Sequence, residues 1–127
     1  MFQGLRTIVY PVVDMDKARQ WYSQVVGKAP YFDEPFYIGF NVGGYELGLL
    51  PAEEPQEAGK PGAAVTYWGV PDADEAFARL MASGATEHEA VHDVGGGIRL
   101  GSAFDPFGNI VGVIYNPHFE IGAVDPK

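Results

Sequence analysis

Apolar residues recur with helical spacing in two stretches of the chain, residues 12–27 and 70–84. One face of the first predicted helix carries four apolar residues, which are Ala18, Trp21, Tyr22 and Val25. The matching face of the second carries Ala73, Ala76, Phe77 and Leu80. Side chains three and four residues apart share a face of an α-helix, so each stretch predicts an amphipathic helix. We interpret its aromatic residues as core rather than as part of a ligand site.

The two predicted helices resemble each other in sequence. Three residues of the first recur 58 residues later, with Asp14, Asp16 and Ala18 matched by Asp72, Asp74 and Ala76. Asp14 and Asp72 are good N-caps, because a short carboxylate accepts hydrogen bonds from free N–H groups of the first turn. Gly27 and Gly84 suit the left-handed residue that follows a helix. The repeat therefore predicts two copies of one structural unit.

Shorter apolar runs flank both predicted helices and indicate β-strands. They cover residues 5–13, 36–42, 45–50, 63–70, 86–94, 98–104 and 109–115. Glycine pairs and triplets, and the type I turn sequence DPFG at 105–108, separate consecutive runs. A polar segment rich in proline and glycine, residues 51–62, joins the halves. The pattern predicts one α+β domain over residues 1–127, with βαβββ module 1 (about 4–50) and βαβββ module 2 (about 63–117).

The sequence HEAVH at residues 88–92 matches the His-Glu-x-x-His pattern of zinc metalloproteases. In a helix, His88 and His92 would lie about 6 Å apart and could share a metal ion. In a strand they would point the same way about 13 Å apart, which is too far for one ion. The segment lies between a helix-ending glycine and a triple glycine, which favours a strand. We interpret the match as accidental.

Composition and charge narrow the classes of partner. The net charge is −9 and there are 8 Lys and Arg residues, which argues against nucleic acid as a partner. An acidic balance favours a cationic ligand by long-range steering, or simply keeps the protein soluble. The chain has no cysteine, so it has no disulfide and no thiolate ligand. No apolar run reaches membrane-spanning length and no secretory signal is apparent, so we expect a cytoplasmic protein without membrane contact.

The doubled βαβββ plan, the helix end WYSQVVG at 21–27 and the sequence DPFGN at 105–109 together resemble one family. It is the glyoxalase, bleomycin resistance protein and dioxygenase superfamily, also called the vicinal oxygen chelate fold. The resemblance extends from about Leu5 to Pro117. It implies that each module curls into an open half-barrel with its helix outside, and that two halves enclose a cavity. It also implies a homodimer, because the family usually covers such open sheet edges by two-fold pairing.

The resemblance also indicates where metal-using members place their His and Glu ligands. Counting from the repeat and from the DPFGN turn, three of these positions hold Thr7, Val65 and Gly112, and the fourth falls near Glu46. Valine and glycine have no ligating side-chain atom and threonine ligates weakly. One carboxylate does not complete a divalent site, which takes three or four protein ligands. We therefore expect no metal cofactor.

The same counting predicts which residues face the cavity. The candidates are Thr7, Val9, Val65, Tyr67, Arg99, Ile110, Gly112 and Ile114. Glu46 joins them if Tyr45, Leu47 and Leu49 pack on the helix, because side chains alternate along a strand. Tyr10 and Trp68 have the opposite parity and are expected in the core. Arg99 has an alternative, an exposed strand residue paired with Asp or Glu.

Three functions are compatible with this cavity. The favoured one is metal-free binding of a small organic molecule, as in antibiotic-sequestering members of the family. The second is a glyoxalase-type lyase or isomerase whose metal uses other ligands, such as Glu46 with His88 or His92. In the third, a metal-free enzyme, Glu46 is a general base whose pKa is raised by apolar surroundings.

Overall fold

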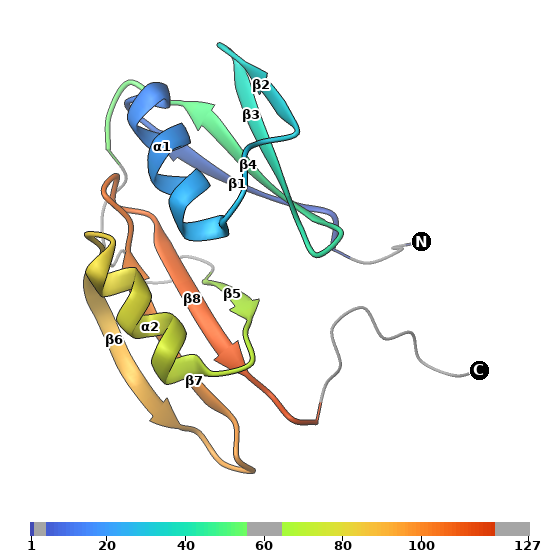
Figure 1. Cartoon of the computed structure of the whole chain (residues 1–127), viewed down its shortest axis with the longest axis vertical. Helices are drawn as coiled ribbons and strands as arrows, with labels where there is room; N and C mark the ends of the chain where they lie inside the picture. The colour runs from blue at the N-terminus through green and yellow to red at the C-terminus, as the bar shows by residue number, and fades with distance from the viewer. Residues whose placement is uncertain (2–4, 56–64, 119–127) are drawn as a thin grey trace. The chain divides into compact units, whose positions relative to one another are not determined.

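The computed structural model describes residues 1, 5–55 and 65–118 of the chain. These residues form two compact units. The first contains module 1 together with Phe107–Asn109, and the second contains the rest of module 2 (Figure 1). The predicted linker lies largely outside the described residues.

Module 1 has the predicted order of a strand, a helix and three strands. Its elements are β1 (Thr7–Val12), α1 (Met15–Val26), β2 (Phe32–Glu34), β3 (Tyr37–Val42) and β4 (Tyr45–Pro51). The strands form one open sheet in the order β1-β4-β3-β2, in which β1 is parallel to β4 and the other pairs are antiparallel. The three-residue β2 has no apolar alternation, which explains why the sequence pattern did not reveal it.

Module 2 repeats this architecture. Its elements are β5 (Thr66–Gly69), α2 (Ala73–Ala82), β6 (Thr86–Asp93), β7 (Arg99–Phe104) and β8 (Ile110–Tyr115). The sheet order is β5-β8-β7-β6, with β5 parallel to β8. The predicted fold of two βαβββ modules with open sheets is confirmed.

Both helices begin as the sequence predicts. The Asp14 carboxylate accepts a hydrogen bond from the Lys17 N–H at 3.0 Å. The Asp72 carboxylate accepts a hydrogen bond from the Glu75 N–H at 3.0 Å. Gly27, at the end of α1, has a φ of 88°, the left-handed conformation that glycine adopts without steric cost. With 12 and 10 residues, α1 and α2 are too short to cross a membrane, and no described helix could do so.

Helix α1 covers one face of the module 1 sheet. Its residues Ala18, Trp21 and Tyr22 are buried, together with Tyr10, Val12, Ile38, Phe40, Leu47 and Leu49 of the strands. The Tyr22 ring stacks on that of Tyr10 at 5.8 Å and meets the edge of Trp21 at 4.8 Å between ring centroids. Trp21 and Tyr22 of α1, and Tyr10, are therefore core, as predicted, whereas Trp68 and Phe77 of module 2 are only half-buried.

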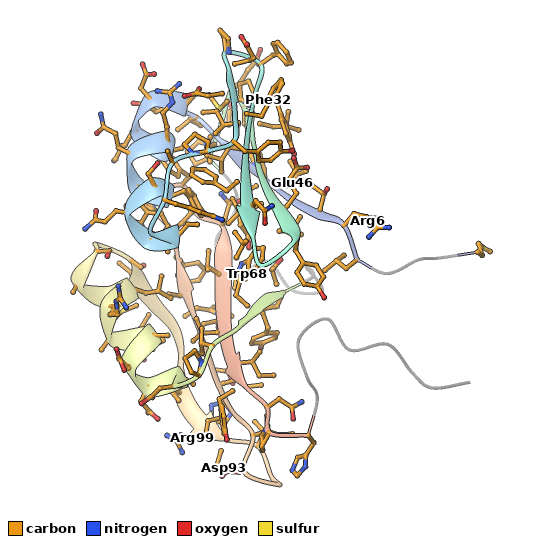
Figure 2. All side chains as sticks on the ribbon, turned by 45° about the vertical axis from the view of Figure 1, so that its right-hand side comes forward. Arg6, Phe32, Glu46, Trp68, Asp93 and Arg99 are labelled. Atoms are coloured by element: carbon orange, nitrogen blue, oxygen red, sulfur yellow. The ribbon has the colours of Figure 1, made fainter. Side chains whose placement is uncertain are left out.

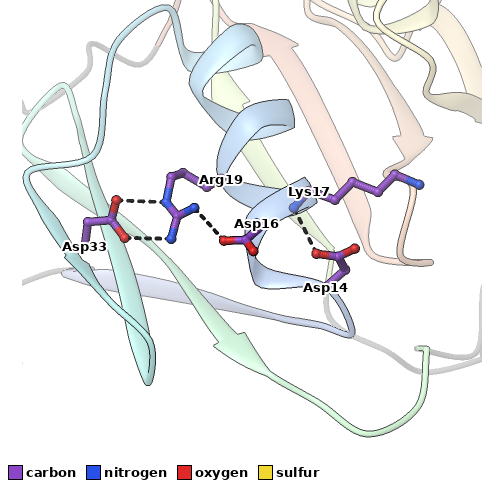
Figure 3. A network of polar contacts seen from close by, with 5 residues as sticks. All are labelled: Asp14, Asp16, Lys17, Arg19 and Asp33. Carbon is purple, nitrogen blue, oxygen red and sulfur yellow. Dashed lines mark hydrogen bonds and ion pairs between the residues drawn. The ribbon is translucent and has the colours of Figure 1, made fainter.

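An ion-pair network joins α1 to the edge strand β2 (Figure 3). Arg19 Nη1 donates to the Asp16 carboxylate at 2.8 Å. On its other side, Arg19 Nη2 donates to Asp33 Oδ1 at 3.0 Å, and its Nε lies 2.8 Å from Asp33 Oδ2. A two-point contact between guanidinium and carboxylate fixes orientation as well as distance. Arg19 thus links α1 to a strand whose three residues are all exposed.

Candidate functional site

Strand register determines which side chains share the face of the module 1 sheet opposite α1. Thr7 pairs with Glu46 and Val9 with Gly48 in the β1–β4 ladder, and Gly39 pairs with Gly48 between β3 and β4. Residues paired across a ladder point to the same face. Leu47 and Leu49, with the opposite parity, are buried on the helix side. Glu46 therefore faces away from α1, as Figure 2 shows.

Glu46 is the centre of a hydrogen-bond network on this face. Its Oε1 accepts from the Thr7 hydroxyl at 3.0 Å and from the Tyr37 hydroxyl at 2.8 Å. Its Oε2 accepts from the Tyr31 hydroxyl. We call these four residues, Thr7, Tyr31, Tyr37 and Glu46, the Glu46 site. They come from β1, the segment before β2, β3 and β4.

Two paired glycines make room for this site. A Cβ on Gly39 would lie 2.8 Å from Glu46 Oε2 and 3.0 Å from the Tyr31 ring. A Cβ on Gly48 would overlap the Tyr37 hydroxyl and lie 2.6 Å from Tyr37 Cζ. The site therefore requires glycine at both positions. Sequence reasoning identified Thr7 and Glu46 and missed Tyr31 and Tyr37; the alternation of Tyr37 with Gly39 was an available signal for Tyr37.

The hydroxyl groups control the ionisation of Glu46. Hydrogen bonds from Tyr31, and then from Tyr37 and Thr7, lower the pKa of Glu46 against the opposing effect of burial. Burial, and then the hydrogen bond to Glu46, raises the pKa of Tyr37 to about 12. Glu46 is therefore an anion at neutral pH with neutral phenols around it. The expectation of a raised Glu46 pKa is wrong, because three donors on the charged form outweigh desolvation.

An exposed group of aromatic rings lies beside the Glu46 site. The Phe32 ring is 6.5 Å from Tyr31, 6.1 Å from Phe36 and 6.2 Å from Tyr37 between centroids. We call these four residues the aromatic cluster. Tyr31 and Phe36 are 65% and 64% exposed, and Phe32 is 38% exposed. Such rings on a surface offer apolar area and π-faces to a ligand.

Removal of the Tyr31 hydroxyl tests the control of Glu46 ionisation. In Tyr31→Phe, the pKa of Glu46 is expected to rise toward its ordinary value of 4.5, because the strongest donor is lost. A depressed folded-state pKa stabilises the protein above pH 4.5, and this contribution disappears as the pH falls through the folded-state pKa. The stability difference between wild type and variant should shrink on acidification. Carboxyl NMR titration measures the pKa, and Tyr115→Phe, a hydroxyl on β8, should leave it unchanged.

In module 2, Tyr67 and Gly112 lie on the same face of the sheet, as the sequence predicts. They are paired between β5 and β8, and a Cβ on Gly112 would lie 2.5 Å from the Tyr67 ring. Ser102 pairs with Gly112 and is buried. Its hydroxyl lies 2.7 Å from His88 Nδ1. Val65 precedes β5 and is exposed.

Arg99 is held by the helix of module 2. Its Nε donates to Asp74 Oδ2 at 2.9 Å and its Nη2 to Asp74 Oδ1 at 3.1 Å. It has the parity of Ala103, which is buried, and the opposite parity to Ser102, the partner of Gly112. Of the two alternatives for Arg99, the structure therefore has the strand residue paired with an acidic side chain, and not a neighbour of Tyr67 and Gly112.

The residues at the expected metal positions do not suit a divalent ion. The Thr7 hydroxyl is used as a donor to Glu46, and Val65 and Gly112 carry no ligating atom. Gly48 pairs with Val9 in module 1, and Gly112 pairs with Tyr67 in module 2. The repeat therefore makes Gly48 the equivalent of Gly112. Glu46 lies two residues before that position. No group of three or more potential ligands occurs among the described residues.

The His-Glu-x-x-His match lies in strand β6, as predicted, and not in a helix. His88 contacts Ser102 and Phe104. His92 has its Nδ1 2.9 Å from the Ala90 carbonyl oxygen and its Nε2 3.5 Å from a Glu89 oxygen. The strand separates the two rings, which removes the geometry that a shared zinc ion needs.

Comparisons with known structures support the fold over almost the whole chain. A glyoxalase-related enzyme from Fulvimarina pelagi is 23% identical, with a TM-score of 0.77 over 96% of this chain and 94% of that one. A lactoylglutathione lyase from Agrobacterium tumefaciens is 22% identical, with a TM-score of 0.74 over 94% and 100%. The fosfomycin resistance protein FosX from Listeria monocytogenes is 16% identical, with a TM-score of 0.76 over 93% and 97%. At these identities the likeness concerns the fold.

No curated protein matches the chain in sequence. The family model described as Glyoxalase/Bleomycin resistance protein/Dioxygenase superfamily matches residues 4–113, which includes both βαβββ modules. Together with the repeated sheets, this match confirms the resemblance inferred from the helix end and the DPFGN turn. The chain belongs to the glyoxalase/bleomycin resistance protein/dioxygenase superfamily.

Proposed function

We propose that this protein binds a small organic molecule at the Glu46 site, on the face of the module 1 sheet opposite α1, without a divalent metal. The observation that carries the proposal is an ionised carboxylate held by three hydroxyl groups beside exposed aromatic rings. Ligand sites commonly combine apolar or aromatic walls with a few polar groups that fix orientation. Here the glycines that accommodate the tyrosines preorganise those groups.

The low pKa of Glu46 favours ligand binding over general-base catalysis as the role of this site. A general base works best when its pKa lies near the operating pH. The pKa of Glu46 is instead below its ordinary value, so it is a weak base at neutral pH. Metal-assisted lyase or isomerase chemistry is disfavoured by the donor set, since Thr7, Val65 and Gly112, at the positions where the family resemblance leads us to expect metal ligands, supply no strong ligand.

A thermal-shift screen tests the proposal. A ligand that binds the folded state raises the melting temperature, and a panel of bleomycin-type and other aromatic drug-like molecules should contain such ligands. Tyr31→Ala should weaken a hit by about 10–100-fold, because it removes a wall and a hydrogen bond to a charged group. Tyr115→Ala, on β8 of module 2, is the matched control and should bind normally.

Two results would contradict the proposal. A ligand whose NMR shifts spare residues 31–48 and whose affinity ignores Tyr31→Ala would place binding elsewhere. One metal ion per chain after purification without chelator, lost in Glu46→Gln, would restore a metalloenzyme.

A further inference from the structure

We infer that the ligand group bound by Glu46 is an organic ammonium or similar monovalent cation, attached to a flat apolar body that lies on the aromatic cluster. This inference deepens the proposed function and rests on it. It assigns the chemical class of the ligand from three features: the charge of the site, the direction of its hydrogen bonds and the exposed rings beside it.

Hydroxyl groups solvate the negative charge of Glu46, and no cationic side chain of the described residues is ion-paired with it. Among the described residues, its side-chain partners are the hydroxyls of Thr7, Tyr31 and Tyr37, and no ion pair includes it. Arg6 precedes Thr7 in sequence, but it is not among the groups that shift the pKa of Glu46. A carboxylate offers about four acceptor positions, so about one remains for a ligand donor.

The direction of these hydrogen bonds disfavours an anionic ligand. Each hydroxyl hydrogen of Thr7, Tyr31 and Tyr37 is donated to Glu46. A carboxylate or phosphate ligand would therefore meet oxygen lone pairs and a like charge, without a donor from this network. An ammonium group, which donates and carries positive charge, is complementary to the same atoms.

The aromatic cluster supplies the second half of the recognition. The Tyr31 ring carries the hydroxyl bonded to Glu46 and lies beside Phe32, so the apolar body of a ligand held at the carboxylate can lie against exposed rings. A flat ligand body gains apolar and stacking contact with these rings, while its charged group stays at the carboxylate. The net charge of −9 assists by steering cations toward the protein.

A set of three probes, matched in shape and different in charge, tests the inference on the full chain. The probes are 2-phenylethylamine, 2-phenylethanol and 3-phenylpropionate, which share an aromatic body and differ in charge. Their affinities are measured by NMR titration at low salt, following residues 31–48. We expect the amine to bind about tenfold more tightly than the alcohol, and the propionate to bind least.

Variants locate the preference at Glu46. Glu46→Gln should reduce the amine to the affinity of the alcohol. Glu87→Gln, which removes an equal charge from β6, should keep the preference. Phe36→Ala should weaken amine and alcohol alike, because Phe36 contributes ring area to the cluster and is not among the side chains bonded to Glu46.

The outcomes separate this inference from the function on which it rests. Equal binding of amine and alcohol at residues 31–48, or a preference that survives Glu46→Gln, would overturn the cationic ligand and leave small-molecule binding on this face intact. No amine binding at millimolar concentration would also overturn the ligand class. Failure of the broad thermal-shift panel would overturn the proposed function itself.

Discussion

Replacement of Tyr22 by alanine is expected to lower the free energy of unfolding by about 3–5 kcal/mol, the range for truncating a buried aromatic side chain. Tyr22 is 0% exposed and its ring contacts both Tyr10 and Trp21. Its loss leaves a cavity between α1 and the sheet that the rigid strands cannot fill. Domains of this size are typically stable by about 5–15 kcal/mol, so the variant should be close to unfolding. Urea denaturation followed by circular dichroism measures the change.

Tyr31→Ala provides the contrast for this prediction. Tyr31 is 65% exposed, and surface substitutions away from special features change stability little. We expect a much smaller loss than in Tyr22→Ala, because the change removes one hydrogen bond at an exposed side chain and leaves no buried cavity. Comparable losses in the two variants would mean that α1 does not pack on the sheet through Tyr22. It would also contradict the assignment of Tyr22 to the core and of Tyr31 to the exposed Glu46 site.

Replacement of Gly48 by alanine is expected to return the pKa of Tyr37 from about 12 toward its ordinary value of 10.0. The new methyl group would lie 2.6 Å from Tyr37 Cζ, so the ring must move away from the sheet. That movement exposes the phenol to water and breaks its hydrogen bond to Glu46, the two main causes of the raised pKa. Ultraviolet titration of the phenolate measures the shift, with Tyr37→Phe assigning the transition.

The same variant changes how stability depends on alkaline pH. A folded-state pKa above the unfolded value contributes stability that is complete below pH 10.0 and is lost as the pH rises through about 12. Gly48→Ala should remove this dependence. Tyr45→Phe, on the same strand, keeps Gly48 and should retain the late transition. A Tyr37 pKa still near 12 in Gly48→Ala would show that the phenol is not packed against Gly48.

The orientation of Glu46 illustrates what a strand pattern can predict. Alternation placed Glu46 and Gly48 on the face opposite Tyr45, Leu47 and Leu49. The burial of Leu47 and Leu49 then decided that the carboxylate lies on the face away from the helix. The N-caps at Asp14 and Asp72, and the strand at residues 86–94, were predictable for the same reason. Each depends on interactions between residues close in sequence, whose geometry secondary structure determines.

Features that depend on distant partners were not predictable in this way. Tyr31 meets Glu46 from 15 positions away, and Arg99 meets Asp74 from 25. The sign of the Glu46 pKa shift followed from hydroxyl groups on other segments, which local polarity does not reveal.

The sequence by itself determined the two βαβββ modules, the helix ends and the separation of Glu46 from Leu47 and Leu49 onto opposite strand faces. Periodicity, capping and residue chemistry are local properties, so they can be read along one segment. Only the tertiary structure decided that Tyr31 and Tyr37 donate hydrogen bonds to Glu46 and that paired glycines make room for the two tyrosines. It also decided that Arg99 pairs with Asp74 of α2. Those outcomes depend on how strands align and where rings find space, which packing between segments determines.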